Sequence, residues 1–140
     1  MNPKIVFVIL HYLAIKETID CVSSIQQNVC YDNYSIIIVD NGSGVEKDSE
    51  RLQQLERDNS KVKLITLQSN LGFARGNNVG FEIAKKEYKA DFISSTDAFG
   101  HLDFINATIP LTIGAAIDVP LSYSYLPKLE EATFSLLSPR

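Results

Sequence analysis

Two uninterrupted apolar runs rich in β-branched residues constrain the fold more than any other feature of the sequence. They occupy residues 4–11 (KIVFVILH) and 34–40 (YSIIIVD). Apolar runs of this length without polar alternation are typical of strands that are buried on both faces of a parallel sheet. Stretches with helical spacing of their apolar residues follow, at residues 16–28 and 45–58. Because neighbouring parallel strands need a crossover connection, this order predicts βαβ units.

The alternation of strand and helix patterns continues to residue 94. Residues 62–67 (VKLITL) and 90–94 (ADFIS) predict a third and a fourth strand, and residues 77–89 predict a helix between them. The residues of this helix that we expect to face the core are Val79, Ile83 and Tyr88. The series predicts an α/β fold of three layers, α/β/α, around a mainly parallel, doubly wound, Rossmann-like sheet.

Length, composition and charge narrow the class of protein. The chain has 140 residues, of which 45% are hydrophobic and 21% charged, as in soluble globular domains. The net charge of -4 and the lack of a Lys/Arg run argue against a nucleic-acid partner. Two cysteines and no secretory signal favour reduced thiols and a cytoplasmic location. The apolar segment at residues 104–117 is interrupted by Pro110 and is shorter than the roughly 20 residues of a membrane helix.

The character of the sequence changes near residue 92. Residues 1–90 carry 11 Lys/Arg and 11 Asp/Glu, whereas residues 91–140 carry 2 and 6, together with four of the five prolines. We therefore expect one domain over residues 1–140, with βα units at 1–93 and a divergent tail at 94–140 to which the sequence assigns no structure.

Three loops are expected to meet at one edge of this sheet. In open α/β sheets, ligands bind beyond the carboxyl ends of the strands, where the strand order reverses. The loops at residues 11–13 (HYL), 40–44 (DNGSG) and 69–78 (SNLGFARGNN) each follow a predicted strand. Asp40 offers a carboxylate that can accept a hydrogen bond from a ribose hydroxyl or a base N–H. Arg75, with glycines on either side of it, supplies the charge that a diphosphate needs.

Each of these residues also has a role that needs no ligand. The alternatives are turn formation for Asp40, a solvated surface position for Arg75, tight helix–sheet packing for Gly72, Gly76 and Gly80, helix capping for Asn77 and Asn78, a satisfied strand-end histidine for His11 and a core aromatic for Tyr12. The convergence of three loops favours a site more strongly than any single residue does.

Familiar nucleotide and hydrolase motifs are absent from the sequence. No glycine precedes Gly42, so the G-x-G-x-x-G fingerprint does not follow the first strand. The P-loop pattern and the G-x-S-x-G elbow are absent as well. These absences argue against an NAD-type Rossmann enzyme and make a metal ion the obvious candidate for holding a pyrophosphate.

The sequence resembles the family 2 glycosyltransferases, which have the nucleotide-diphospho-sugar transferase (GT-A) fold. The resemblance rests on IVFVILHYLAIKETIDCVSSI, IIIVDNGSG and NLGFARGNNVGFEIAKKEYKADFI, and it covers residues 4–93. It implies a GT-A fold that is incomplete on its C-terminal side. It also implies transfer of a sugar from a UDP- or dTDP-linked donor to a hydroxyl acceptor, with inversion, as in the synthesis of polysaccharides or cell-surface glycans.

The resemblance also assigns residues to a donor site. Asp40 would bind the base, and Tyr12 and the His11 backbone would line its pocket. The full set implied in nucleotide binding is His11, Tyr12, Asp40, Gly42, Gly72, Arg75 and Asn78. Asp97, in SSTDAFG, stands near the Asp-containing motif that holds Mg²⁺ or Mn²⁺ in family members, although a turn or helix-cap role fits it equally well.

The catalytic base and the activity itself stay open at this point. Family members have a late Asp or Glu as general base, and here Asp103, Asp118, Glu130 and Glu131 are available without a recognisable motif. The leading hypothesis is a transferase with a nucleotide-sugar donor and a glycan or lipid-linked acceptor, with peripheral contact at the inner face of the membrane as an open question. The alternative is a non-catalytic remnant that binds nucleotide sugars. A signalling receiver module ranks last, because it needs paired acids after the first strand.

Overall fold

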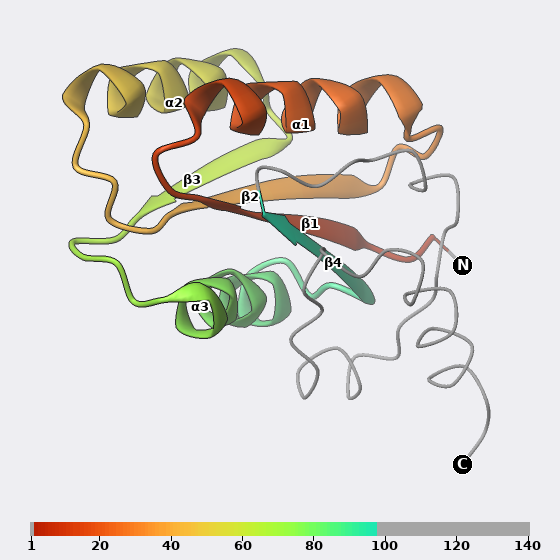
Figure 1. Ribbon diagram of the computed structural model, residues 1–140. Helices are drawn as coiled ribbons and strands as arrows, with labels where there is room; N and C mark the ends of the chain where they lie inside the picture. The colour runs from red at the N-terminus through yellow and green to blue at the C-terminus, as the bar shows by residue number, and fades with distance from the viewer. Residues whose placement is uncertain (1, 98–140) are drawn as a thin grey trace, which may run out of the picture.

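Strands and helices alternate along the chain as the sequence predicts (Figure 1). The computed structural model describes residues 2–97, the last two by their backbone alone. The elements are β1 (Ile5–His11), α1 (Ile15–Asn28), β2 (Tyr34–Asp40), α2 (Glu46–Asp58), β3 (Val62–Thr66), α3 (Phe73–Lys86) and β4 (Phe92–Asp97).

The four strands form one parallel sheet in the order β3-β2-β1-β4. Helices α1 and α2 cover one face of the sheet and α3 covers the other (Figure 1). This arrangement confirms the three-layer α/β/α architecture. The chain moves outward from β1 through β2 to β3 and then returns through α3, which places β4 on the other side of β1. The strand order therefore reverses between β1 and β4.

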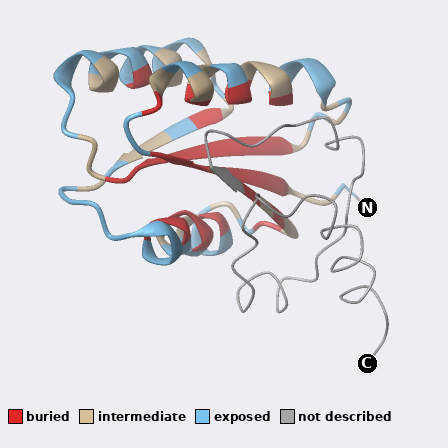
Figure 2. Cartoon of the chain, in the orientation of Figure 1, coloured by how far each residue is buried: buried red, intermediate tan, exposed pale blue. Residues whose placement is uncertain are grey.

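The core is split between the two faces of the sheet. Every residue of β1 and β2 is buried, as Figure 2 shows for the central strands. In β1, Ile5, Phe7 and Ile9 pack on the side of α1 and α2, whereas Val6 and Val8 pack on the side of α3. This alternation is the period-2 geometry of a strand, and it accounts for the uninterrupted apolar run.

Helix α3 differs from its prediction in where it begins. It starts at Phe73, four residues before the expected start at residue 77, so Arg75 belongs to the helix and not to a loop. Gly72 occupies the N-cap position, and the expectation that Asn77 or Asn78 caps the helix is wrong.

The buried face of α3 agrees only in part with the prediction. Ile83 and Tyr88 are half-buried and pack against the core on this side of the sheet, as expected, whereas half-buried Val79 is not part of that core. The fully buried residues of the helix are Gly76, Asn77, Gly80, Phe81 and Ala84. The prediction assumed that large apolar side chains mark the core face.

Glycine brings the backbone of α3 close to the sheet instead. A Cβ atom on Gly80 would lie 2.3 Å from Val8 Cγ1, and one on Gly76 would lie 2.7 Å from Leu10 Cδ1. Gly76 and Gly80 therefore serve helix–sheet packing, which is one of the two roles considered for them.

Strand β4 starts two residues later than predicted and extends to Asp97. In the parallel register with β1, Leu10 lies opposite Asp97. Within residues 2–97, no helix is long and apolar enough to cross a membrane. The candidate general bases Asp103, Asp118, Glu130 and Glu131 lie outside the described residues.

Candidate functional site

The carboxyl ends of β1, β2 and β4 meet at one edge of the sheet, beside the point where the strand order reverses. His11 ends β1 and lies in register with Asp40, which ends β2. Asp97 ends β4 on the other side of β1. Two strand spacings, about 10 Å, therefore separate Asp40 from Asp97 across this edge. An open α/β sheet binds its ligands at such a position.

Asp40 is a buried carboxylate with a defined role in its own turn. Its side chain is 2% exposed, and Oδ1 accepts a hydrogen bond from the Ser43 backbone N–H at 3.0 Å. The Asp40 carbonyl also accepts the Leu67 N–H at 2.9 Å, which fixes the end of β2 against the loop after β3. Turn formation is thus part of its role. A carboxylate that accepts one backbone bond keeps acceptor capacity for a ligand N–H.

His11 lies beside Asp40 on the face covered by α1 and α2. The imidazole is fully buried, and its Nδ1 lies 2.7 Å from Thr18 Oγ1. The Thr18 hydroxyl donates its only proton to the Ala14 carbonyl at 2.8 Å. The hydrogen-bond network therefore assigns the proton between His11 and Thr18 to His11 Nδ1.

The other ring nitrogen of His11 is an unusual feature of this edge. His11 Nε2 is buried and has no hydrogen-bond partner among the described residues. Burial lowers the pKa of His11, and the nearby carboxylates of Asp40 and Asp48 oppose that shift. The ring is then neutral near pH 7, with a lone pair on Nε2. The expected satisfied strand-end histidine is correct for Nδ1 and wrong for Nε2.

Asn41 joins the loops of this edge, although the sequence indicated no role for it beyond its place in the loop at residues 40–44. Its buried side chain donates from Nδ2 to Asn70 Oδ1 at 3.1 Å and to the Gly72 carbonyl at 3.2 Å. Its Oδ1 accepts the Leu71 N–H at 3.0 Å. Its place directly after Asp40, in a loop expected to meet the loop after β3, was the only signal that could have found it.

Two glycines of the predicted site have structural reasons for being glycine. Gly42 has φ +73°, and a Cβ atom there would lie 2.3 Å from the carbonyl carbon of Ser69. It therefore lets the loop after β2 touch the backbone of the loop after β3. Gly72 has φ +83°, and nothing lies within 4 Å of the position of its Cβ atom. A left-handed N-cap, and not crowding, explains glycine at position 72.

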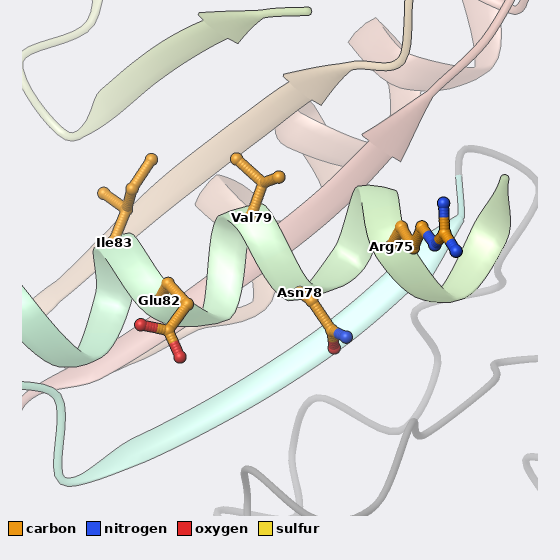
Figure 3. A pocket seen from close by; sticks show the side chains of 5 residues that line it. All are labelled: Arg75, Asn78, Val79, Glu82 and Ile83. Atoms are coloured by element: carbon orange, nitrogen blue, oxygen red, sulfur yellow. The ribbon is translucent and has the colours of Figure 1, made fainter. Parts of the chain in front are cut away.

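Arg75 and Asn78 lie on the outer side of α3. They line an open groove of about 410 Å³ together with Val79, Glu82 and Ile83 (Figure 3). His11 lies on the opposite face of the sheet, in register with Asp40. The described residues thus bring Arg75 and Asn78 near the same edge but not into one pocket with Asp40, and their part in nucleotide binding stays a prediction.

Tyr12 is 45% exposed, so its expected alternative as a core aromatic is wrong. It belongs to a group at the carboxyl edge that contains every exposed large hydrophobic side chain of residues 2–97. These are Tyr12, Leu13, Val45, Leu71 and Phe73. Exposed apolar side chains gathered at one place are typical of a surface that meets another molecule.

The predicted metal site rests on Asp97 alone. Among the described residues, no group of three or more His, Cys, Asp or Glu side chains could hold a metal ion. A single carboxylate suits a divalent ion that keeps water and phosphate oxygens as its other ligands.

The order of the sheet, the flanking helices and the reversal beside these strand ends define a Rossmann-like domain of the GT-A type. The family model of Glycosyl transferase family 2 matches residues 6–98, from β1 through β4, and the chain belongs to this family. Its members are glycosyltransferases that use nucleotide-sugar donors, generally with a divalent metal. A search of curated proteins found no match to the chain.

Proposed function

We propose that this chain transfers a sugar from a UDP- or dTDP-linked donor to a hydroxyl group of a glycan or lipid-linked acceptor, in the synthesis of a polysaccharide or cell-surface glycan. The observation that carries the proposal is the buried Asp40 carboxylate at the carboxyl end of β2, next to the reversal of strand order. We place the reaction in the cytoplasm, with the acceptor presented at the inner face of the membrane.

The donor base binds at Asp40 in this proposal. The carboxylate accepts the imide N–H of uracil or thymine, and the exposed ring of Tyr12 lies in the neighbouring loop, where it packs against the face of the base. The backbone at His11 and Gly42 borders the same pocket. Gly72, Arg75 and Asn78 close the diphosphate side from the start of α3.

The diphosphate lies toward β4. Asp97 would hold Mg²⁺ or Mn²⁺ there, and a bound ion would supply charge neutralisation to the departing nucleoside diphosphate. The acceptor oxygen forms a bond to the anomeric carbon as the bond from that carbon to the diphosphate oxygen breaks. The hydroxyl proton passes to a general base, for which Asp103, Asp118, Glu130 and Glu131 are the candidates.

The proposed base contact is tested by titrating UDP and dTDP into the chain with Mn²⁺ in a calorimeter, using Asp40→Asn as the variant. Losing a charged acceptor weakens a buried hydrogen bond by about 1.5–3 kcal/mol, so we expect affinity to fall roughly 10- to 100-fold. Asp91→Asn is the matched control, because Asp91 accepts one backbone N–H, from Lys4 at 2.7 Å, at the opposite edge of the sheet. Equal affinity of wild type and Asp40→Asn would reject the proposed base contact.

Turnover separates the transferase from the second candidate, a non-catalytic protein that binds nucleotide sugars. We expect slow hydrolysis of the UDP-sugar by the wild-type chain when Mn²⁺ is present, and its loss in Asp97→Asn. Binding without any hydrolysis or transfer would favour the non-catalytic candidate.

A further inference from the structure

We infer that Asn41 is the positioning residue of the donor site, holding the three loops at the carboxyl edge in one geometry without touching the ligand. This inference rests on the proposed function, because the group it positions is the Asp40 carboxylate. Nothing in the role proposed for Asp40 itself requires an amide at the next position.

The Asn41 side chain uses both of its donor protons and one of its two acceptor sites within the protein. Both protons of Nδ2 are donated, one to Asn70 Oδ1 and one to the Gly72 carbonyl. Oδ1 accepts the Leu71 N–H. Asn70 Oδ1 in turn accepts the Gly72 N–H at 2.7 Å, so the turn before α3 is built around this amide.

The backbone of Asn41 links the same network to β1. Its N–H donates to the His11 carbonyl at 2.8 Å. The loop after β1 is held a second time, because the Leu13 N–H donates to Ser43 Oγ at 3.1 Å and the Ser43 N–H donates to Asp40 Oδ1. The loops after β1, β2 and β3 are therefore connected through the segment that carries Asp40.

The first turn of α3 completes the enclosure of Asn41. A Cβ atom on Gly76 would lie 3.1 Å from both Cγ and Nδ2 of Asn41, so the amide packs directly against the helix backbone. Asn41 is 2% exposed, so its side chain offers almost no surface to a ligand. Its effect on binding must act through the loops that it holds.

An aspartate at position 41 would have nearly the same shape as asparagine, but an oxygen acceptor would replace the NH₂ donor. The carboxylate of Asn41→Asp still accepts the Leu71 N–H, but it faces Asn70 Oδ1 and the Gly72 carbonyl with no proton to donate. Two oxygen acceptors beside the new carboxyl also raise its pKa, because they disfavour the ionised form. A lower pH returns one proton and thus one of the two lost hydrogen bonds.

The test measures hydrogen exchange and nucleotide affinity of the full chain for wild type and Asn41→Asp, at about pH 7.5 and about pH 5. At the higher pH we expect the amides of residues 69–73 to exchange at least about tenfold faster than in wild type at the same pH, and UDP affinity to fall at least about tenfold. At the lower pH both ratios to wild type should move toward one. A merely structural loss would not recover as the pH is lowered.

Asn33→Asp is the matched control. Asn33 also donates two hydrogen bonds from Nδ2 to carbonyl groups, those of Asn2 at 2.7 Å and Pro3 at 3.2 Å, at the amino edge of the sheet. We expect it to leave UDP affinity and the exchange of residues 69–73 within twofold of wild type.

A second pair of variants covers the case in which Asn41→Asp fails to fold. Asn70 is exposed, and Asn70→Ala removes one acceptor of the Asn41 amide, whereas Asn70→Asp keeps it. We expect faster exchange of the Leu71 amide, which donates to Asn41, and weaker UDP binding only in Asn70→Ala. The Gly72 amide is not counted in this comparison, because it donates to Asn70 itself.

The outcomes separate this inference from the proposed function. Unchanged exchange in both Asn41→Asp and Asn70→Ala would overturn the inference, and so would faster exchange with wild-type affinity for UDP. If the wild-type chain binds neither UDP nor dTDP, the proposed function fails, and the exchange comparison alone still accepts or rejects Asn41 as the residue that holds the loops.

Discussion

His11 is a buried polar residue whose protonation state depends on its few neighbours. Its Nδ1 is satisfied by Thr18, while Nε2 has no partner among the described residues. A buried acceptor without a partner costs free energy, and protonating it would place a charge inside the protein. Burial lowers the pKa of His11 more than the Asp40 carboxylate raises it, so the ring is neutral.

The lowered pKa of His11 predicts a pH dependence of stability. Below the pKa of an unfolded histidine, about 6.5, the unfolded chain binds a proton that the folded chain resists, so the free energy of unfolding falls as pH falls. His11→Asn should flatten this dependence between about pH 6.5 and 5, by up to about 1.4 kcal/mol per pH unit. Urea unfolding of wild type and variant across this range measures it. Parallel pH profiles for the two proteins would contradict the assignment.

At the residue scale, the sequence predicted where a residue lies in a strand or loop better than it predicted its hydrogen-bond partners. Asp40 was placed correctly at the end of a strand because the apolar run stops there and a turn sequence, Asn-Gly-Ser-Gly, follows it. The partners of Asn41 lie 29 to 31 residues away along the chain, so no local pattern indicates that they meet its amide. No local pattern indicates either that His11 Nε2 is buried without a hydrogen-bond partner among the described residues.

At the element scale, α3 is the part that the sequence described least well. Periodicity located the helix and its C-terminal half, and Ile83 and Tyr88 do pack against the core, but large apolar residues did not indicate the glycines through which the helix approaches the sheet. Gly76 and Gly80 form part of the packing surface, beside Phe81 and Ala84, and glycine carries no hydrophobic signal. The apolar runs of β1 and β2 had no such ambiguity, because both of their faces are buried.

Gly80→Ala tests the packing of α3 against the sheet. In an exposed helix this substitution stabilises by about 0.5–1 kcal/mol. Here the added methyl meets Val8 Cγ1 at 2.3 Å and Val39 Cγ2 at 3.2 Å, on two central strands, so we expect a loss of about 1–3 kcal/mol in the free energy of unfolding. Denaturant titration provides the measurement, with Asn78→Ala on the exposed side of the same helix as control. A stabilised Gly80→Ala protein would show that the helix can move away without cost.

At the scale of the whole molecule, burial falls from the centre of the sheet to β3. β1 and β2 are buried throughout, while β3 has one buried residue in five. The sequence predicted a parallel sheet but not its full strand order. The alternation of strands and helices does not determine on which side of β1 the fourth strand is added.

This gradient predicts unequal effects of the same truncation. Ile38→Ala, in β2 and fully buried, should lower the free energy of unfolding by about 2–5 kcal/mol. Ile65→Ala, in β3 and half-buried, should cost less than about 1.5 kcal/mol, since less apolar surface leaves water there on folding. Equilibrium unfolding in urea compares the two. Equal losses would mean that β3 is as central to stability as β2.

The enclosed amide of Asn41 has a last consequence, for the chemical ageing of the chain. Asn41 is followed by Gly42, and Asn-Gly is the dipeptide in which the backbone nitrogen of glycine attacks the preceding amide most readily, closing a succinimide ring and releasing ammonia. Ring closure needs a side chain that can rotate toward that nitrogen, and in the folded chain three hydrogen bonds hold it elsewhere. Deamidation at this position should then proceed mainly from molecules that have opened, and its products include the aspartate that fits this edge poorly. The fraction of chains deamidated at Asn41 should therefore rise with storage time, and those chains lose the amide that holds the loops together.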